Sequence, residues 1–346
     1  QAAAIAAESY AQNTNEIGAV LVTTGPGGTN AVTGLAAAWI DSTPVLFLSG
    51  QVKRSDRIGA SGVRQMGSQE VDIVPIVAPL TKYAVTVMEQ TEIRCVLEKA
   101  HYLAMHGRRG PVWIDIPLDV QAAEIDPSIL RGYEPPAEET NVPASAIIEM
   151  RGLMEVAKRP VLLVGNGVKA AGAEVALQKL REKTGIPTLL TWKTIDLLDF
   201  DDPLYFGTPG GMGHRYANFV LQNADLLLVL GSRLDSSLTA WNHQNFAPHA
   251  RKIVIDIDPR ETDKLDMDIA VRVDGSLADV LPLLAAQDYA MHANLPAWQT
   301  YCRRMREKYP AITEEMRAES DYVDAHVFID ELSHQLTADD VIVPES

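Results

Sequence analysis

Residues 25–30 combine the residue types that can hold a ligand against the main chain. Their sequence is Gly-Pro-Gly-Gly-Thr-Asn. A glycine has no Cβ, so a ligand can approach the backbone closely, and Pro26 fixes φ and lacks an N–H donor. Thr29 and Asn30 place polar side chains at a helix start, where backbone N–H groups are unpaired. The pattern indicates a ligand-binding loop, although a tight strand-to-helix turn would select the same glycines.

Two apolar segments flank this loop and predict how it is positioned. Ala19–Val22 precedes the loop, and Val45–Leu48 follows it after a helix rich in small residues. The order strand, loop, helix, strand predicts a βαβ unit, with the loop at the carboxyl edge of a parallel sheet. Open α/β sheets bind their ligands at this edge, where a helix offers unpaired N–H groups and the positive end of its dipole.

Composition excludes several classes of protein. The chain has 346 residues, 47% of them hydrophobic, a formal charge of −16 and two cysteines, Cys95 and Cys302. This length predicts more than one domain, and no apolar run approaches the roughly 20 residues of a membrane span. The negative charge disfavours nucleic acid and anionic membranes as partners, and two cysteines fit a cytoplasmic protein better than a disulfide scaffold or zinc site. We therefore expect a cytoplasmic globular protein.

The pattern of strands and helices predicts two consecutive three-layer α/β domains with parallel sheets. Near-continuous apolar strands in the second half indicate a sheet that helices cover on both faces. A segment rich in Pro and Glu separates the two domains, and a polar helical connector leads to the start of a third, truncated domain with a strand at 341–346. The expected divisions are 1–122 for the first domain, 123–145 for the linker, 146–285 for the second domain, 286–325 for the connector and 326–346 for the third.

The motifs occur in an order known from one enzyme family. GPGGTN, a Gly/Ala-rich helix, DSTPV and SGQV follow one another as in the N-terminal domain of thiamine-diphosphate-dependent enzymes. The chain resembles this family, and within it the acetolactate synthase group. The resemblance implies a pyrimidine-binding domain at 1–122, a Rossmann-like central domain, and thiamine diphosphate held with Mg²⁺, whose ligands would follow Ser346. It also implies a homodimer or tetramer and leaves a regulatory subunit as a possible partner.

The resemblance assigns residues to the pyrimidine site. Pro26, Gly27 and Asn30 match the family's cofactor loop, and Gln69 in GSQEVD matches a glutamine that lines the reaction centre. Gln69 is therefore the expected catalytic residue, with a surface amide as the plain alternative. The glutamate that activates the cofactor would lie immediately before Gln1, so these 346 residues alone are expected to be inactive.

Two departures from the group's pattern leave the reaction open. Ser68 stands where an aromatic residue is usual, and Leu118 stands where a lysine is usual. Both positions bear on the second substrate, and the loop at 53–67 is longer than usual. The first hypothesis is decarboxylation of pyruvate and transfer of two carbons to a second 2-oxo acid. The alternatives are another 2-oxo acid decarboxylase, oxidase or carboligase, or a non-catalytic nucleotide-binding module, which would leave GPGGTN and Gln69 unexplained.

FAD is a possible second cofactor, because the central domain binds it in acetolactate synthases. Tight turns between strands and helices would select the same glycines, and Ser237 and the order Asp274-Gly275 depart from the group's pattern. No metal site is expected in this chain, and Asp201-Asp202 is expected to be a solvated turn. The positions that match FAD-binding residues are Asp41, Arg108, Gly165, Gly167, Gly211, Met212, Gly213, Arg233, Asp235, Asp256 and Asp274.

Overall fold

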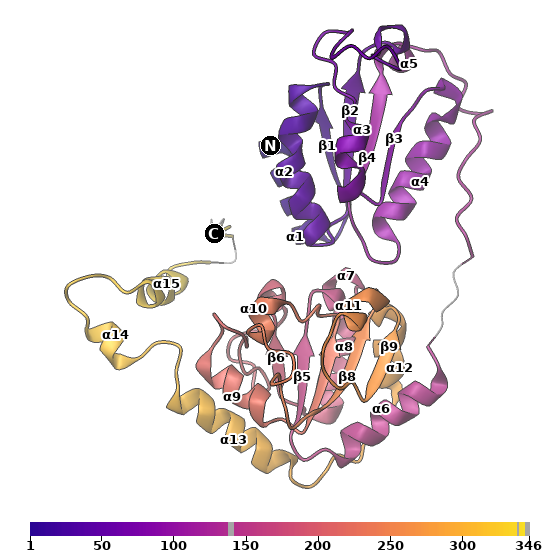
Figure 1. Cartoon of the computed structure of the whole chain (residues 1–346). Coiled ribbons are helices and arrows are strands. Elements are labelled where there is room, and N and C mark those ends of the chain that lie inside the picture. The colour runs from indigo at the N-terminus through magenta and orange to yellow at the C-terminus, as the bar shows by residue number, and fades with distance from the viewer. Residues whose placement is uncertain (138–141, 338, 343–346) are drawn as a thin grey trace. The chain divides into compact units, whose positions relative to one another are not determined.

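The computed structural model describes residues 1–137, 142–337 and 339–342 (Figure 1). Its contacts divide the chain into two compact units, Gln1–Thr140 and Asn141–Ser346. Each unit is a parallel sheet with helices packed on it, so the predicted fold class is confirmed. No helix among the described residues has both the length and the apolar character needed to cross a membrane.

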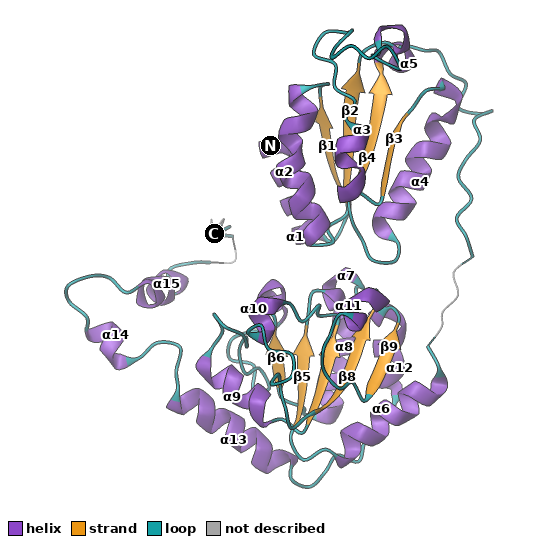
Figure 2. Cartoon of the chain, in the orientation of Figure 1, coloured by secondary structure: helices purple, strands orange, loops and turns teal. Residues whose placement is uncertain are grey.

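Helices and strands alternate along the first unit (Figure 2). Its elements are α1 (Ala2–Thr14), β1 (Gly18–Val22), α2 (Pro26–Ile40), β2 (Val45–Gln51), η1 (Arg54–Asp56), α3 (Val74–Val77), η2 (Ala78–Leu80), β3 (Tyr83–Thr86), η3 (Gln90–Glu92), α4 (Ile93–Met105), β4 (Val112–Pro117) and α5 (Leu118–Gln121).

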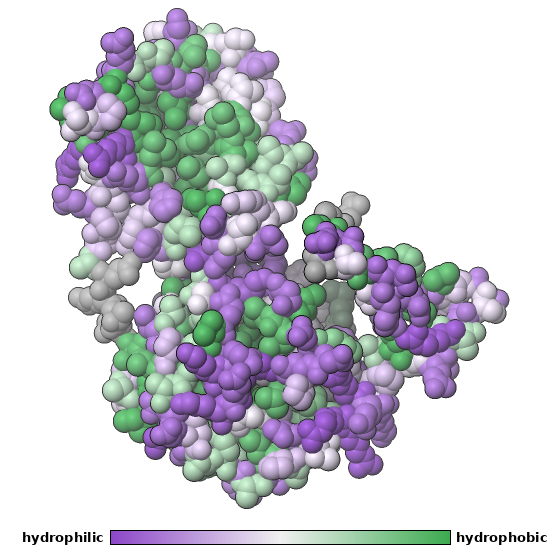
Figure 3. All heavy atoms as spheres, turned by 180° about the vertical axis from the view of Figure 1, so that it is seen from behind, coloured by the Kyte–Doolittle hydropathy of each residue, from purple (hydrophilic) through white to green (hydrophobic). Residues whose placement is uncertain are grey.

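The four strands of the first unit run parallel in the order β1-β2-β4-β3. Alternating side chains point to opposite faces, so Phe47 and Trp113 stack under α1 and α2, while Ile114 faces α4. α4 packs on β4 and β2, and Leu21 of the edge strand β1 is exposed. Seen from behind, this unit carries a broad apolar area (Figure 3). In a parallel sheet all strands end at one edge, so the loops after β1, β2 and β4 lie together.

The second unit contains a longer series of the same kind. Its elements are α6 (Ala144–Val156), β5 (Pro160–Val164), α7 (Gly167–Ala170), α8 (Glu174–Thr184), β6 (Thr188–Leu190), η4 (Trp192–Leu197), α9 (Arg215–Asn223), β7 (Leu226–Leu230), α10 (Ser236–Thr239), β8 (Arg251–Asp256), α11 (Pro259–Asp263), β9 (Val271–Asp274), α12 (Leu277–Ala286), α13 (Leu295–Lys308), α14 (Glu314–Ala318) and α15 (Ala325–Ser333).

The second sheet has the strand order β6-β5-β7-β8-β9. Every residue of β5, β6 and β7 is buried, as the continuous apolar runs predict. The chain leaves β5 toward β6 on one side and returns to β7 on the other side. The order of the strands therefore reverses between β5 and β7, and such a reversal opens a crevice at the carboxyl ends of the two strands.

Two local expectations differ from the structure. Asp202 is not a solvated turn residue, because its carboxylate accepts a hydrogen bond of 2.6 Å from the buried guanidinium of Arg181. Buried arginines require such a partner, and no sequence pattern marks this pair. Of the strand expected at 341–346, Val341 and Ile342 lie outside any strand, and residues 343–346 lie outside the described residues.

Candidate functional site

The loop between β1 and α2 forms the first candidate site. Gly25 has φ +60, and a Cβ there would lie 2.0 Å from the carbonyl oxygen of Gln69, so this position accepts only glycine. Pro26 is the first residue of α2, and no side chain caps the helix. The N–H groups of Gly27 and Gly28 therefore have no partner within the helix; Gly27 is half-buried, so a ligand can approach it, whereas Gly28 is buried.

The structure brings Gln69 to this loop. The backbone of Gln69 packs directly against Gly25, although 44 positions separate them in the sequence. Gln69 has φ +57, a left-handed conformation that is uncommon for residues other than glycine, and it is exposed. Asn30, one turn into α2, has its Oδ1 2.8 Å from the main-chain nitrogen of Gln1. The expected cofactor-loop residues and Gln69 therefore share one edge of the sheet.

Beneath both loops lies a buried glutamine at the end of β2. Gln51 accepts hydrogen bonds from Thr24 Oγ1 (3.0 Å) and from the N–H of Val52 (2.9 Å). Its amide nitrogen donates to the carbonyl of Val71 (2.9 Å) and to Asp115 (3.2 Å). A backbone donor on one side and a backbone acceptor on the other fix the orientation of the amide. Gln51 thus ties the loop before α2 to the loop that carries Gln69.

Asp115 of β4 lies under Gln51 and is fully buried. Its carboxylate accepts hydrogen bonds from Ser49 (2.6 Å), Gln51 (3.2 Å) and Thr86 (3.2 Å), and Ser49 in turn accepts one from Trp113 (2.8 Å). Burial raises the pKa of Asp115 above its ordinary value, and the three hydrogen bonds offset this effect only in part. This network links three strands at the edge where the candidate site lies.

Glu70 follows Gln69 and is also buried. Its Oε1 accepts the N–H of Ile58 at 2.5 Å, and its Oε2 accepts those of Met66 and Gly67 at 3.1 Å each. One carboxylate therefore ties together the long loop that leads to Gln69. The roles of Gln51, Asp115 and Glu70 are not evident from the sequence, where Gln51 and Asp115 are polar residues in apolar strands and Glu70 is an acid within a loop.

Both departures from the acetolactate synthase pattern lie at the same edge. Ser68 is exposed beside Gln69. Leu118 directly follows β4 as the first residue of α5, and 52% of its surface is exposed. Gln51, the last residue of β2, pairs with Pro117, the last residue of β4. Leu118 directly follows Pro117 and therefore lies at the same edge of the sheet as Gln51. Ser68 is on a loop and Leu118 begins a short helix, so both positions are exposed and neither is in the core.

Two glycine turns follow β5 and β7, where the order of the strands reverses. A Cβ on Gly165 would be 2.3 Å from the carbonyl oxygen of Gly231, and one on Gly167 would be 2.7 Å from the Cα of Gly231. The N–H groups of Gly165 and Gly167 donate to the carbonyls of Leu230 and Gly231. These glycines allow the two turns to pack backbone against backbone, which accounts for them without a ligand.

A second glycine-rich loop lies against α10. The N–H of Gly211 donates to the carbonyl of Ser237 at 2.9 Å, and a Cβ on Gly213 would overlap the carbonyl of Thr208. Met212, between these two glycines, is 93% exposed. Asp235 caps α10, and hydrogen bonds from Ser237 and Leu238 hold its pKa below the ordinary value although burial opposes them. The structure therefore brings this loop and Asp235 together.

The remaining candidates for FAD binding lie in two places. Asp256 and Asp274 end the paired strands β8 and β9, and Asp274 accepts hydrogen bonds from Arg272 at 2.7 and 3.0 Å. Arg233 follows β7 at the same edge of the second sheet. Asp41 and Arg108 belong to the first unit, where Arg108 donates to Ser42, the residue after Asp41. Asp41 directly follows α2, and Arg108 follows α4 and reaches Ser42. Both therefore lie near the C-terminal end of α2, away from the loop at its start.

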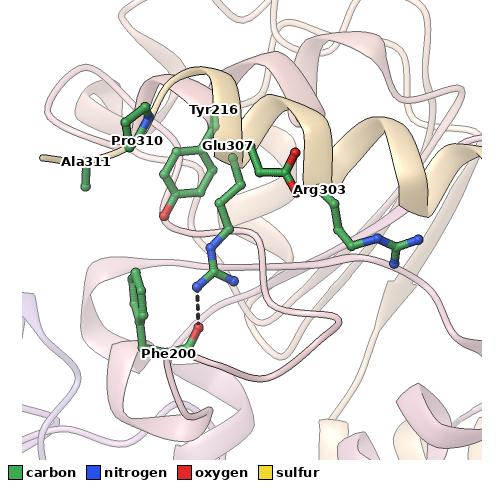
Figure 4. Close-up of a pocket in the computed structure, with 7 residues that line it drawn as sticks. Phe200, Tyr216, Arg303, Glu307, Pro310 and Ala311 are labelled. Carbon is green, nitrogen blue, oxygen red and sulfur yellow. Dashed lines mark hydrogen bonds between the residues drawn. The ribbon is translucent and has the colours of Figure 1, made fainter. Parts of the chain in front are cut away.

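A pocket of about 420 Å³ lies elsewhere in the second unit (Figure 4). No residue expected from the sequence to bind a cofactor lines it. Arg306 donates to the carbonyl of Phe200 at 2.8 Å and stacks on its ring, so this guanidinium connects α13 to the loop after η4. Among the described residues, no group of three His, Cys, Asp or Glu side chains is arranged to hold a metal ion.

Comparison with known families identifies both units. Residues 1–76 match the thiamine pyrophosphate enzyme N-terminal TPP binding domain, and residues 147–284 match the thiamine pyrophosphate enzyme central domain. The chain belongs to the thiamine pyrophosphate enzymes. Thiamine pyrophosphate is another name for thiamine diphosphate, and the TPP binding domain contains loop 25–30, Gln51, Gln69 and Glu70.

Curated relatives of this thiamine pyrophosphate enzyme chain carry one name. It is 34% identical to acetolactate synthase isozyme 2 large subunit of Escherichia coli over the whole chain and 60% of that protein. It is 38% identical to acetolactate synthase of Arthrospira platensis and 37% identical to the acetolactate synthase large subunit of Corynebacterium glutamicum, over 90% of the chain in each case. The chain spans 54% and 49% of those two proteins, so it corresponds to about half the length of its relatives.

Proposed function

We propose that the protein containing this chain decarboxylates pyruvate and transfers the two-carbon unit to a second 2-oxo acid. The observation that carries this proposal is the contact of Gln69 with Gly25, which joins two separate sequence motifs into one site. The names of the relatives, acetolactate synthases, support the same reaction.

The residues of the loop fit a thiamine cofactor. Gly27 has an N–H group without a partner in the helix, the exposed Pro26 offers an apolar surface without a donor, and the helix lacks a competing side-chain cap. When bound, thiamine diphosphate supplies an electron sink for the carbon that loses CO₂. Pro26, Gly27 and Asn30 are proposed to hold its pyrimidine half, and Gln69 to hydrogen-bond the reacting oxygen atoms.

An assay of the full-length protein with thiamine diphosphate, Mg²⁺ and pyruvate tests this proposal. Acetolactate should form, and a second 2-oxo acid added in excess should yield the mixed product. Gln69→Ala should lower kcat by roughly 10-fold or more, as loss of a group that contacts the reacting atoms does. Gln121→Ala, an exposed glutamine in α5, is the matched control. Wild-type protein that consumes no pyruvate would refute the proposal.

A different reaction on the same site is the second candidate, because Ser68 and Leu118 depart from the acetolactate synthase pattern. A small hydroxyl beside Gln69 and an uncharged, exposed side chain at position 118 would present a second substrate with different contacts. If CO₂ is released and no acetolactate forms, the other product identifies the reaction. Acetaldehyde would indicate a decarboxylase, hydrogen peroxide an oxidase, and an adduct with an added aldehyde a carboligase.

FAD in the second unit is part of the proposal. The reversal of strand order between β5 and β7, the exposed Met212 and the cation of Arg233 fit a dinucleotide at the carboxyl edge of the sheet. Asp274 fits less well, because Arg272 already engages its carboxylate. Flavin absorbance in gently purified full-length protein would support this assignment, and reconstitution with FAD that leaves no bound flavin would refute it.

The remaining parts of the proposal concern the metal and the partners. Mg²⁺ would be bound by residues outside this sequence, and the intact protein would be a cytoplasmic homodimer or tetramer. The relatives named as large subunits suggest that a regulatory subunit is a further partner. Sedimentation of the full-length protein tests the oligomer, and a monomer that retains full activity would contradict it.

A further inference from the structure

Gln69 has a backbone conformation that its neighbours must maintain. Its φ of +57 lies in the left-handed region, which residues with a side chain rarely adopt. Such conformations persist where the surrounding structure determines them. The backbone carbonyl of Gln69 also lies against Gly25, so a shift of this residue would change the loop that begins α2.

Glu70, the residue after Gln69, constrains the segment that precedes Gln69. Only 6% of its surface is exposed, and its carboxylate accepts the N–H groups of Ile58, Met66 and Gly67. Hydrogen bonds to a carboxylate are shorter and stronger than those between neutral groups. The three donors are 12, 4 and 3 positions before Glu70, so a single side chain gathers the long loop around the residue next to Gln69.

The constraint on the C-terminal side comes from the sheet. The carbonyl of Val71 accepts a hydrogen bond from Gln51, which Asp115 orients from below. Glu70 and Val71, the two residues that follow Gln69, are therefore fixed to separate parts of the unit, whereas the side chain of Gln69 itself is exposed. This arrangement holds the backbone of Gln69 while its amide stays open to a ligand.

We propose that Glu70 is a positioning residue, whose buried carboxylate folds residues 58–70 so that Gln69 faces the cofactor loop. The inference rests on the proposed function, in which Gln69 contacts the reacting atoms. Glu70 does not touch substrate or cofactor and acts through the geometry of the loop. It should therefore affect the chemical step more than the binding of either ligand, because misplacing a reacting group by about 1 Å can cost about 100-fold in rate.

Steady-state kinetics of the full-length enzyme, saturated with thiamine diphosphate, test this role. Glu70→Ala should lower kcat per folded molecule by about 10- to 100-fold, with the KM for pyruvate and the cofactor Kd within about threefold of wild type. Glu70→Gln keeps one acceptor oxygen and should recover part of the loss. Amide hydrogen exchange at Ile58, Met66 and Gly67 should accelerate in both variants, most in Glu70→Ala.

Glu98→Ala is the matched control. Glu98 also accepts a backbone N–H from a distant segment, that of Tyr133 at 2.7 Å, but from α4. The Glu98→Ala variant should leave kcat unchanged. If Glu70→Ala accelerates exchange and yet keeps the wild-type kcat per folded molecule, the positioning role is wrong. If Glu70→Ala does not fold, a wild-type kcat in Glu70→Gln with accelerated exchange overturns the role equally. Inactivity of the wild type and Glu98→Ala alike would instead refute the proposed function on which the role depends.

Discussion

Gln51→Ala should destabilise the first unit by about 3–4 kcal/mol. The side chain is buried and makes four hydrogen bonds, to Thr24, Val52, Val71 and Asp115. Each is worth about 1 kcal/mol net, and the half-buried N–H of Val52 and carbonyl of Val71 would lose their partner. Water that enters from the exposed loops would return part of this sum, which gives the stated range.

Urea unfolding of the chain, followed by circular dichroism, measures this free energy. Gln121→Ala is the control, because this glutamine is exposed in α5 at the same edge and donates one hydrogen bond, to Ile116. Exposed positions of this kind change stability by at most about 0.5 kcal/mol. If Gln51→Ala unfolds at the same urea concentration as Gln121→Ala, Gln51 does not connect the two loops as we infer.

Three further outcomes are expected. Asp202→Ala should cost about 2–3 kcal/mol in urea unfolding, because the buried Arg181 guanidinium loses its carboxylate partner and keeps only its hydrogen bonds to Gln178 and Thr188. Adding Arg181→Met should restore most of this loss, and an equal loss in both variants would contradict the reasoning. Burial raises the pKa of Asp115, so the folded chain holds this proton more tightly than the unfolded chain, and stability should fall as pH rises from about 4 through the raised pKa. Asp115→Asn should therefore show a smaller difference in unfolding free energy between about pH 4 and pH 7 than wild type. If this difference is the same in the variant and in wild type, Asp115 is not its cause. Because burial raises the pKa of the Cys302 thiol, Ellman's reagent should label Cys95 first and Cys302 only after unfolding, and equal rates in the folded chain would contradict that.

Local patterns were sufficient to predict most of the architecture. Ala19–Val22 and Val45–Leu48 lie within β1 and β2, because short apolar runs next to Gly and Pro turns form strands wherever a sheet is available. The all-apolar run at 226–230 is the fully buried β7 in the middle of a parallel sheet. The strand order of either sheet could not be read from these patterns, because it depends on which distant strands pair.

The site was only partly predictable for a related reason. The resemblance to the thiamine-diphosphate-dependent enzymes pointed to Pro26, Gly27 and Gln69, and the structure places them at one edge. Gln51 and Glu70 were not predicted to have a role, since hydrogen bonds over 20 and 12 positions leave no periodic signal in the chain. Long-range polar pairs of this kind become visible only when the fold has brought their partners together.

The glycine turns at the ends of β5 and β7 have a consequence for protein engineering. Gly165, Gly167 and Gly231 are in mutual backbone contact, so a side chain at any one of them would strike the other turn. The two turns, although more than 60 positions apart, therefore have to be exchanged together. A chimera that imports the turn after β5 from a relative will need the turn after β7 from the same donor, and exchange of either turn alone should yield misassembled protein.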